Sequence, residues 1–165
     1  MAQYGTRIKI LDFGKLICGN RMKIYKIAQE LTFYHGTNNI IDGDFRLSQN
    51  DPGWFGRGVY VTSYPEHAKI YGKYVYKVSV NCNKFAEVIV SDNYKKAIYV
   101  GDAKIANEKA SGNKNFLQND FEWSNLFSDN LKGMGYCGIK ITLNGKPNAE
   151  VVIFDPSDVI FGERI

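Results

Sequence analysis

The order of apolar and polar residues predicts a series of short β-strands along most of the chain after residue 30. Such strands are rich in valine, isoleucine and tyrosine and are separated by glycine and asparagine. The last two flank the sequence NGKPN, whose Asn-Gly pair predicts a β-hairpin. The predicted strand segments are 31–35, 58–63, 74–81, 85–90, 136–143 and 149–155.

Helix signals are fewer, and the clearest group follows the second predicted strand. In the segment 63–72, Ser63 is a candidate N-cap and Gly72 suits a helix end. Pro65 and Glu66 between them suit a first helical turn. These signals predict one compact helix.

The remaining segments have weaker patterns. The polar stretch 91–133 is interpreted as helical with breaks, and the sequence SNLFSDNLKGMG within it predicts a helix from Ser124 to Gly133. The stretch 38–58 is rich in Asn, Asp and Gly and predicts a long loop, or a short helix followed by a loop. Residues 7–30 fit either a strand or a helix. Many short strands, few helices and long loops together indicate an α+β fold.

Composition and charge place few limits on function. The 165-residue chain is 44% hydrophobic and 23% charged, which is ordinary for a folded protein and predicts one domain over residues 1–165. The net charge of +4 is small and the lysines are spread out, so a polyanionic partner is permitted but not required. No apolar run approaches the length of a membrane span, and we expect no membrane association.

The cysteines give an expectation about the redox environment. Cys18, Cys82 and Cys137 are odd in number and widely spaced, which indicates neither a disulfide framework nor a zinc site. We therefore expect a reducing compartment and no bound metal. The N-terminus lacks the continuous apolar core and the cleavage site of a signal peptide. These features predict a cytoplasmic protein, with delivery into another cell left open.

A histidine stands at the end of the first predicted strand, in the sequence FYHGT. The chain has two histidines, and Gly36 directly after His35 lets other groups approach the backbone closely. A His-Gly pair is also common in ordinary turns. The pair alone therefore leaves both a structural and a functional interpretation open.

Two tyrosines and one carboxylate extend this candidate site. Tyr60 and Tyr71, eleven residues apart, could flank one slot and stack on a flat heteroaromatic ring, with a further gain if the ring is cationic. The alternative is that both are half-buried in the core. Glu150 opens an otherwise apolar segment and is either a solvated strand-end residue or a catalytic carboxylate.

In this order, YHGT, GRGVYVTS, a second tyrosine and a late glutamate resemble one branch of the ADP-ribosyltransferases. This His-Tyr-Glu branch includes diphtheria toxin and the poly(ADP-ribose) polymerases. The segment GYCGIKI…AEVVIFDP is similar to the closing hairpin of small bacterial and phage members. The resemblance covers a core of about residues 32–158. It implies a split, mainly antiparallel β-sandwich that clamps NAD in a cleft.

The resemblance implies NAD contacts for residues near the first two strands. His35 is expected to bind a ribose hydroxyl on the adenosine side, and Gly36 to bind the nicotinamide carboxamide through its backbone. Thr37 is expected to add a hydroxyl contact. Arg57 lies where a basic side chain reaches the pyrophosphate, unless it is a solvated loop charge.

The same resemblance makes His35, Tyr60 and Glu150 the catalytic set. Tyr60 and Tyr71 are expected to sandwich the nicotinamide ring, and Glu150 to hold the 2′-hydroxyl of the nicotinamide ribose and orient the acceptor. A carboxylate there favours the positive charge that builds on the ribose as the bond to nicotinamide breaks. Nicotinamide leaves as a neutral molecule, so no general acid is needed.

Three residues limit the resemblance or fall outside it. Ala68 stands where the polymerases keep a serine, which puts a side-chain contact to the carboxamide in doubt. Asn148 stands where the arginine-modifying branch prefers a carboxylate, which argues against arginine as a target of that type. His67 is expected to lie on the exposed side of its helix and to be inert.

The implied activity is transfer of single ADP-ribose units from NAD to a macromolecule by a small, monomeric, toxin- or effector-like enzyme. The alternatives are an NAD glycohydrolase, which loses ADP-ribose to water, and a module that only binds NAD, ADP-ribose or a partner. The intact His-Tyr-Tyr-Glu set favours catalysis. No motif identifies the acceptor, and relatives use protein, DNA, RNA and small molecules.

Overall fold

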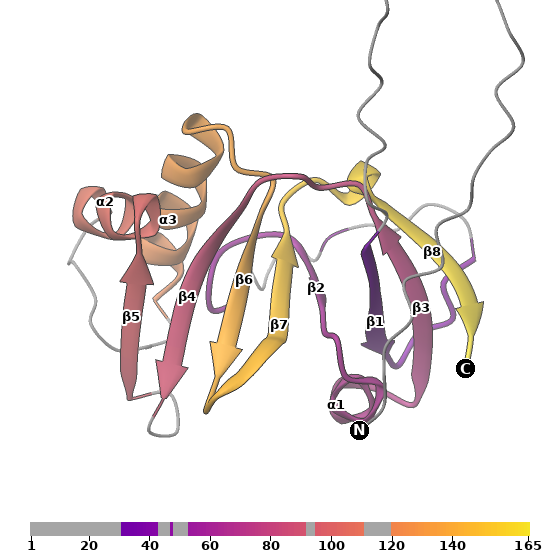
Figure 1. Ribbon diagram of the computed structural model, residues 1–165. Helices are drawn as coiled ribbons and strands as arrows, with labels where there is room; N and C mark the ends of the chain where they lie inside the picture. The colour runs from indigo at the N-terminus through magenta and orange to yellow at the C-terminus, as the bar shows by residue number, and fades with distance from the viewer. Residues whose placement is uncertain (1–30, 43–46, 48–52, 92–94, 111–119) are drawn as a thin grey trace, which may run out of the picture.

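The computed structural model describes residues 31–42, 47, 53–91, 95–110 and 120–165, which form an α+β structure with two β-sheets (Figure 1). The three-stranded sheet has the order β1-β3-β8 and comprises β1 (Leu31–Thr37), β3 (Tyr74–Val80) and β8 (Val159–Arg164). The five-stranded sheet has the order β2-β7-β6-β4-β5 and comprises β2 (Val59–Val61), β7 (Lys146–Ile153), β6 (Gly138–Leu143), β4 (Phe85–Ser91) and β5 (Lys96–Val100). The helices are α1 (Pro65–Tyr71), α2 (Asp102–Lys109), α3 (Phe121–Gly133) and the short 3₁₀ helix η1 (Pro156–Asp158).

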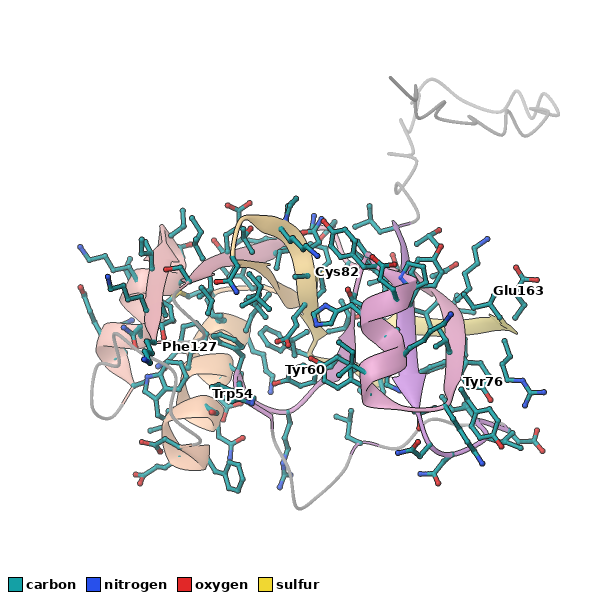
Figure 2. The ribbon with its side chains drawn as sticks, turned by 90° about the horizontal axis from the view of Figure 1, so that it is seen from below. Trp54, Tyr60, Tyr76, Cys82, Phe127 and Glu163 are labelled. Atoms are coloured by element: carbon teal, nitrogen blue, oxygen red, sulfur yellow. A yellow bond between two sulfur atoms is a disulfide. The ribbon has the colours of Figure 1, made fainter. Side chains whose placement is uncertain are left out.

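Two hydrophobic cores hold these layers together. One contains Phe127 and lies between the five-stranded sheet and helices α2 and α3. The other lies between the two sheets and contains Phe33 from β1 and Val151 from β7. Figure 2 shows Phe127 and Tyr76, one from each core, on opposite sides of the molecule with Tyr60 between them. Paired strands are antiparallel except β4 and β6, so the expected α+β class with mainly antiparallel sheets is confirmed.

Each of the six predicted strand segments contains a strand, and the predicted hairpin is formed by β6 and β7. At its turn Asn144 and Gly145 have φ angles of 47° and 81°, the left-handed conformation that a tight hairpin turn of this kind requires. The pattern missed β8 and β5. β5 has the sequence KAIYV, which alternates between exposed and buried residues within the stretch expected to be helical.

Helix α1 forms where expected, but its N-terminus lacks the predicted side-chain cap. It begins at Pro65 after Tyr64, and no side chain caps it. Ser63, the expected cap, instead donates its backbone N–H to the carbonyl oxygen of Asn148, 3.1 Å away. Gly72 ends the helix as predicted. The start of α1 is therefore fastened to β7 rather than closed by its own cap.

Helix α3 begins three residues before the expected position. Its first residue is Phe121, and the side chain of Asp120 accepts a hydrogen bond from the N–H of Trp123. Ser124, the expected start, is buried inside the helix, whose end at Gly133 agrees with the prediction. Asp120 suits an N-cap, but the sequence pattern favours the serine one turn later as the start of the helix.

Cys82 and Cys137 form a disulfide, with their Cα atoms 5.7 Å apart, so the expectation of unpaired cysteines is wrong for these two. Cys82 follows β3 and Cys137 precedes β6, so the bond joins the two sheets. The sequence separation of 55 residues gives no sign of this pairing, because only the tertiary fold brings the two strand ends together. The cysteine pattern therefore gives no support to a reducing compartment, and the cytoplasmic location stays a prediction.

Reduction of this disulfide should destabilise the protein. Closing a long loop restricts the unfolded chain, and such a bond typically adds about 2–4 kcal/mol to the free energy of unfolding. We expect a loss of about that size when urea unfolding is compared with and without a reductant. A Cys82→Ala/Cys137→Ala variant should match the reduced protein, and Cys18→Ala should retain the effect of the reductant. Equal stability of the oxidised and reduced proteins would contradict the bond.

Some sequence expectations lie outside the described residues. These are the segment 7–30 with Cys18, part of the loop 38–58, and the parts 92–94 and 111–119 of the stretch expected to be helical. Within the ranges given above, no helix has both the length and the apolar character needed to cross a membrane.

Candidate functional site

The candidate site lies where β2 and the residues after it bond to both sheets. Val61 pairs with Val151 of β7 in the five-stranded sheet. The next residue, Thr62, points its backbone groups to the opposite side and exchanges two hydrogen bonds of 2.8 and 2.9 Å with Tyr34 of β1, in the three-stranded sheet. Ser63 then donates its N–H to the carbonyl oxygen of Asn148 in β7. Residues 61–63 therefore link the edges of the two sheets beside Glu150, the residue before Val151, and we call this junction the fork.

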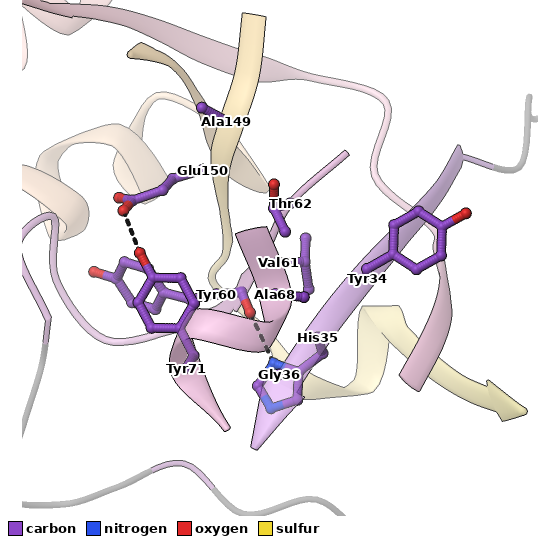
Figure 3. A pocket seen from close by; sticks show the side chains of 10 residues that line it. All are labelled: Tyr34, His35, Gly36, Tyr60, Val61, Thr62, Ala68, Tyr71, Ala149 and Glu150. Atoms are coloured by element: carbon purple, nitrogen blue, oxygen red, sulfur yellow. Dashed lines mark hydrogen bonds between the residues drawn. The ribbon is translucent and has the colours of Figure 1, made fainter. Parts of the chain in front are cut away.

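A cavity of about 220 Å³ occupies the fork (Figure 3). Five residues that the sequence predicts to share a site line it together: His35, Gly36, Tyr60, Tyr71 and Glu150. The other lining residues are Tyr34, Val61, Thr62, Ala68 and Ala149. The cavity walls therefore come mainly from β1, from β2 and α1, which follow one another closely, and from β7 near the end of the chain.

Two of the predicted contact residues do not line this cavity. Thr37 ends β1, and its hydroxyl oxygen accepts a hydrogen bond from the backbone N–H of Asn39, 3.1 Å away. Arg57 is exposed in the loop before β2. Thr37 is one residue past the lining part of β1, and Arg57 precedes β2. The expected contacts of both residues with NAD therefore stay predictions.

His35 is fixed by a hydrogen bond to the backbone. Its Nδ1 lies 2.8 Å from the carbonyl oxygen of Tyr60, and a carbonyl can only accept, so Nδ1 carries the proton. Burial lowers the pKa of His35, against the opposing effect of this bond. The neutral ring therefore has Nε2 as a hydrogen-bond acceptor. The edge contact with Phe161, at 5.5 Å between ring centroids, holds the ring orientation.

Gly36 presents backbone groups at the edge of β1. The N–H and C=O of Tyr34 bond to Thr62 rather than to β3. In an antiparallel ladder this direction repeats every second residue, so the N–H and C=O of Gly36 also point away from β3. A side chain at Gly36 would overlap the carbonyl group of Ala68 in α1. Glycine is therefore required here for the close packing of α1 on β1.

Tyr60 is held by its hydroxyl group as well as by its ring. The hydroxyl accepts a hydrogen bond from the N–H of Phe55 at 3.1 Å and donates one to the carbonyl oxygen of Gly56 at 2.9 Å. Tyr60 lies opposite Val152 of β7, and both pack on the core beneath the helices, whereas Val61 packs in the core between the sheets. The ring therefore has one fixed position at the cavity wall.

Glu150 lies buried in the middle of a strand, whereas the sequence predicts it at the start of one. It is the fifth residue of β7, pairs with Ile141 of β6, and is 9% exposed. One carboxylate oxygen, Oε1, accepts a hydrogen bond of 2.7 Å from the hydroxyl of Tyr71. Figure 3 shows this bond directed from α1 across the cavity to β7. The solvated strand-end interpretation of Glu150 is therefore wrong.

Several cavity residues carry no signal in the sequence. Tyr34, Thr62 and Ala149 are ordinary strand residues in the pattern, and they reach the cavity because residues 61–63 bond to both β7 and β1. Tyr34 and Thr62 themselves form the link to β1 through their paired backbone bonds. Only the tertiary pairing identifies them.

Comparisons with known proteins give little further information. No protein-family model matches the chain, and no curated protein matches it. Among solved structures, one described as "Crystal structure of an anti-CRISPR protein" is similar, with 13% sequence identity and a TM-score of 0.44. The alignment covers 82% of this chain and 96% of that chain. A likeness at this level carries no argument about function, which must be inferred from the cavity.

Proposed function

We propose that this protein is an enzyme that transfers ADP-ribose from NAD to an acceptor and releases nicotinamide. The observation that carries the proposal is the cavity at the fork, where a buried carboxylate, two tyrosines and a neutral histidine converge. The cavity is smaller than the roughly 300–1,000 Å³ of pockets that enclose a whole drug-sized ligand. It suits the nicotinamide–ribose end of NAD, with the rest of the dinucleotide outside.

Nicotinamide fits the chemistry of the wall formed by β1, β2 and α1. The outward N–H and C=O of Gly36 match the carboxamide, which has one acceptor oxygen and an NH₂ donor. The rings of Tyr60 and Tyr71 supply aromatic surface for the pyridinium ring, whose positive charge favours aromatic faces. Ala68 contributes only a methyl group, so carboxamide recognition relies on the backbone.

The reaction breaks the bond between the anomeric carbon of the ribose and the pyridinium nitrogen. The bonding electrons move to the nitrogen, so nicotinamide leaves neutral and positive charge develops on the ribose. The carboxylate of Glu150 stabilises that charge. Tyr71 holds this carboxylate in place through the 2.7 Å hydrogen bond, and Nε2 of His35 accepts a hydrogen bond from a ribose hydroxyl.

The direct test is nicotinamide release from NAD by the purified protein, measured by chromatography together with the fate of the ADP-ribose. Free ADP-ribose as the main product identifies a glycohydrolase, and ADP-ribose joined to a macromolecule identifies a transferase. NAD binding without any nicotinamide release would leave only a binding module and end the proposal.

Substitutions at Tyr60 separate its ring from its hydroxyl. Tyr60→Ala should weaken NAD binding by about 1–3 kcal/mol, the scale of stacking on a planar base. Tyr60→Phe keeps the ring and should keep NAD affinity, but it leaves Phe55 N–H and Gly56 C=O without this partner and should lower the unfolding free energy by about 1–2 kcal/mol. Calorimetric NAD titration and urea unfolding measure the two effects. Equal loss of affinity in both variants would contradict stacking.

A further inference from the structure

A second cavity, of about 310 Å³, lies between α1 and the β6–β7 hairpin. It adjoins the cavity proposed to bind NAD. Ala149 lines both cavities and directly precedes Glu150. The second cavity is lined by His67 and Ile70 of α1 and by Leu143 and Lys146 of the hairpin. The two cavities therefore meet at Ala149, the residue before the one proposed to stabilise the ribose charge.

Hydrogen bonds hold the two sides of this second cavity together. The hydroxyl of Tyr64 donates to the carbonyl oxygen of Pro147 at 3.0 Å, and the N–H of Ser63 donates to the carbonyl oxygen of Asn148 at 3.1 Å. Asn148 has a φ of 53°, a conformation that non-glycine residues adopt uncommonly. The start of α1 and the first residues of β7 are therefore fixed relative to each other, so the cavity is a built feature of the fold.

His67 lines the second cavity and contacts Tyr71, which lines the first. Its ring centroid lies 5.8 Å from that of Tyr71, whose hydroxyl bonds to Glu150. It is half-buried on the wall of the second cavity, so its expected position on the exposed side of the helix is wrong. Imidazole is the side chain best suited to take a proton near neutral pH.

We propose that the second cavity receives a protein side chain bearing an O–H or N–H group, and that His67 takes the proton of that group. This proposal rests on the proposed function. The acceptor heteroatom bonds to the anomeric carbon as the bond from that carbon to nicotinamide breaks. Nicotinamide leaves with the electron pair of the broken bond, and the acceptor proton passes to His67 and then to solvent. The products are ADP-ribosylated protein, nicotinamide and one proton.

The cavity rim favours a protein over a nucleic acid. Ile70 is 74% exposed, and Leu143 adds further apolar surface. The charged residues Glu66 and Lys146 have opposite signs, whereas sites for nucleic acids are strongly positive. A carboxylate acceptor is disfavoured as well, because at neutral pH it arrives without a proton and has no use for His67.

The test compares His67→Gln with the wild type and with Lys69→Gln as a matched control, since Lys69 is exposed on the same helix and lines neither cavity. The probes are adenine-labelled NAD and total protein from a bacterial lysate. For His67→Gln we expect NAD affinity to stay within about twofold of wild type, and label on protein to fall by about 100-fold. Lys69→Gln should match the wild type in both.

The chemistry of the label decides the acceptor class. Label that is removed by protease, survives nuclease and maps by mass spectrometry to a side chain with an O–H or N–H group supports the proposal. Nuclease-sensitive label or label on a carboxylate overturns it, as does full labelling of protein by His67→Gln or an equal loss of NAD affinity in that variant. Nicotinamide release without any labelled macromolecule also overturns it but leaves NAD cleavage intact. Absence of release from the wild type is the separate result that ends the proposed function itself.

Discussion

Replacing Glu150 with glutamine should lower the rate of nicotinamide release by about 100-fold or more, while NAD affinity stays within about threefold of wild type. Glutamine has nearly the same size and still accepts a hydrogen bond from the hydroxyl of Tyr71. The substitution removes the negative charge and little else. An interaction that strengthens only as charge builds on the ribose raises the rate of bond breaking and leaves NAD affinity unchanged.

The position of Glu150 makes this result a strict test. The side chain is buried in the middle of β7, beside the residues that link the two sheets. Burial of a charged side chain costs free energy, so the charge of Glu150 does not itself stabilise the fold. Glu150→Gln should accordingly be at least as stable as wild type, which separates loss of chemistry from loss of structure.

A matched control is Glu87→Gln, which removes an exposed carboxylate from β4 of the same sheet. Its nicotinamide release should equal that of the wild type. Single-turnover rates, NAD titration and thermal unfolding are measured for all three proteins. Unchanged turnover in Glu150→Gln would remove Glu150 from the mechanism and, with it, most of the argument for an ADP-ribosyl transfer site.

The strand pattern was predictable because each strand signal is local. The segments that carry His35 and Tyr60 alternate or form apolar runs between turn residues, and the structure has β1 and β2 there. β5 was missed because its five residues follow a polar stretch and resemble a helical window as much as a strand. The disulfide between Cys82 and Cys137 was missed for a different reason, since no local signal reports which strand ends meet.

The candidate site was predictable only in part, for the same physical reason. His35, Tyr60 and Glu150 stand out as polar or aromatic residues in apolar surroundings. The bond between Tyr71 and Glu150 spans 79 residues of sequence, and the bonding of Thr62 to Tyr34 depends on tertiary pairing. Neither follows from spacing.

Gly36→Ala should lower the unfolding free energy by about 1–3 kcal/mol, the usual cost of forcing a methyl group into a packed contact. The new Cβ would overlap the carbonyl oxygen of Ala68, and Gly72 at the end of α1 is equally close to the backbone of Thr37. Helix α1 must therefore move away from β1. Because α1 carries Tyr71, the same variant should also lose about tenfold or more in NAD affinity, about 1.4 kcal/mol.

These two effects distinguish the two roles of Gly36. If the glycine only leaves room for the nicotinamide carboxamide, the variant loses NAD affinity but unfolds like wild type in the absence of NAD. If it seats α1 on β1, stability without NAD falls as well, and we expect this outcome. Gly133→Ala is the control, because a Cβ there meets no atom within 4 Å and alanine suits the helix position. Wild-type stability in Gly36→Ala would contradict the close packing of α1 that places Tyr71 against Glu150.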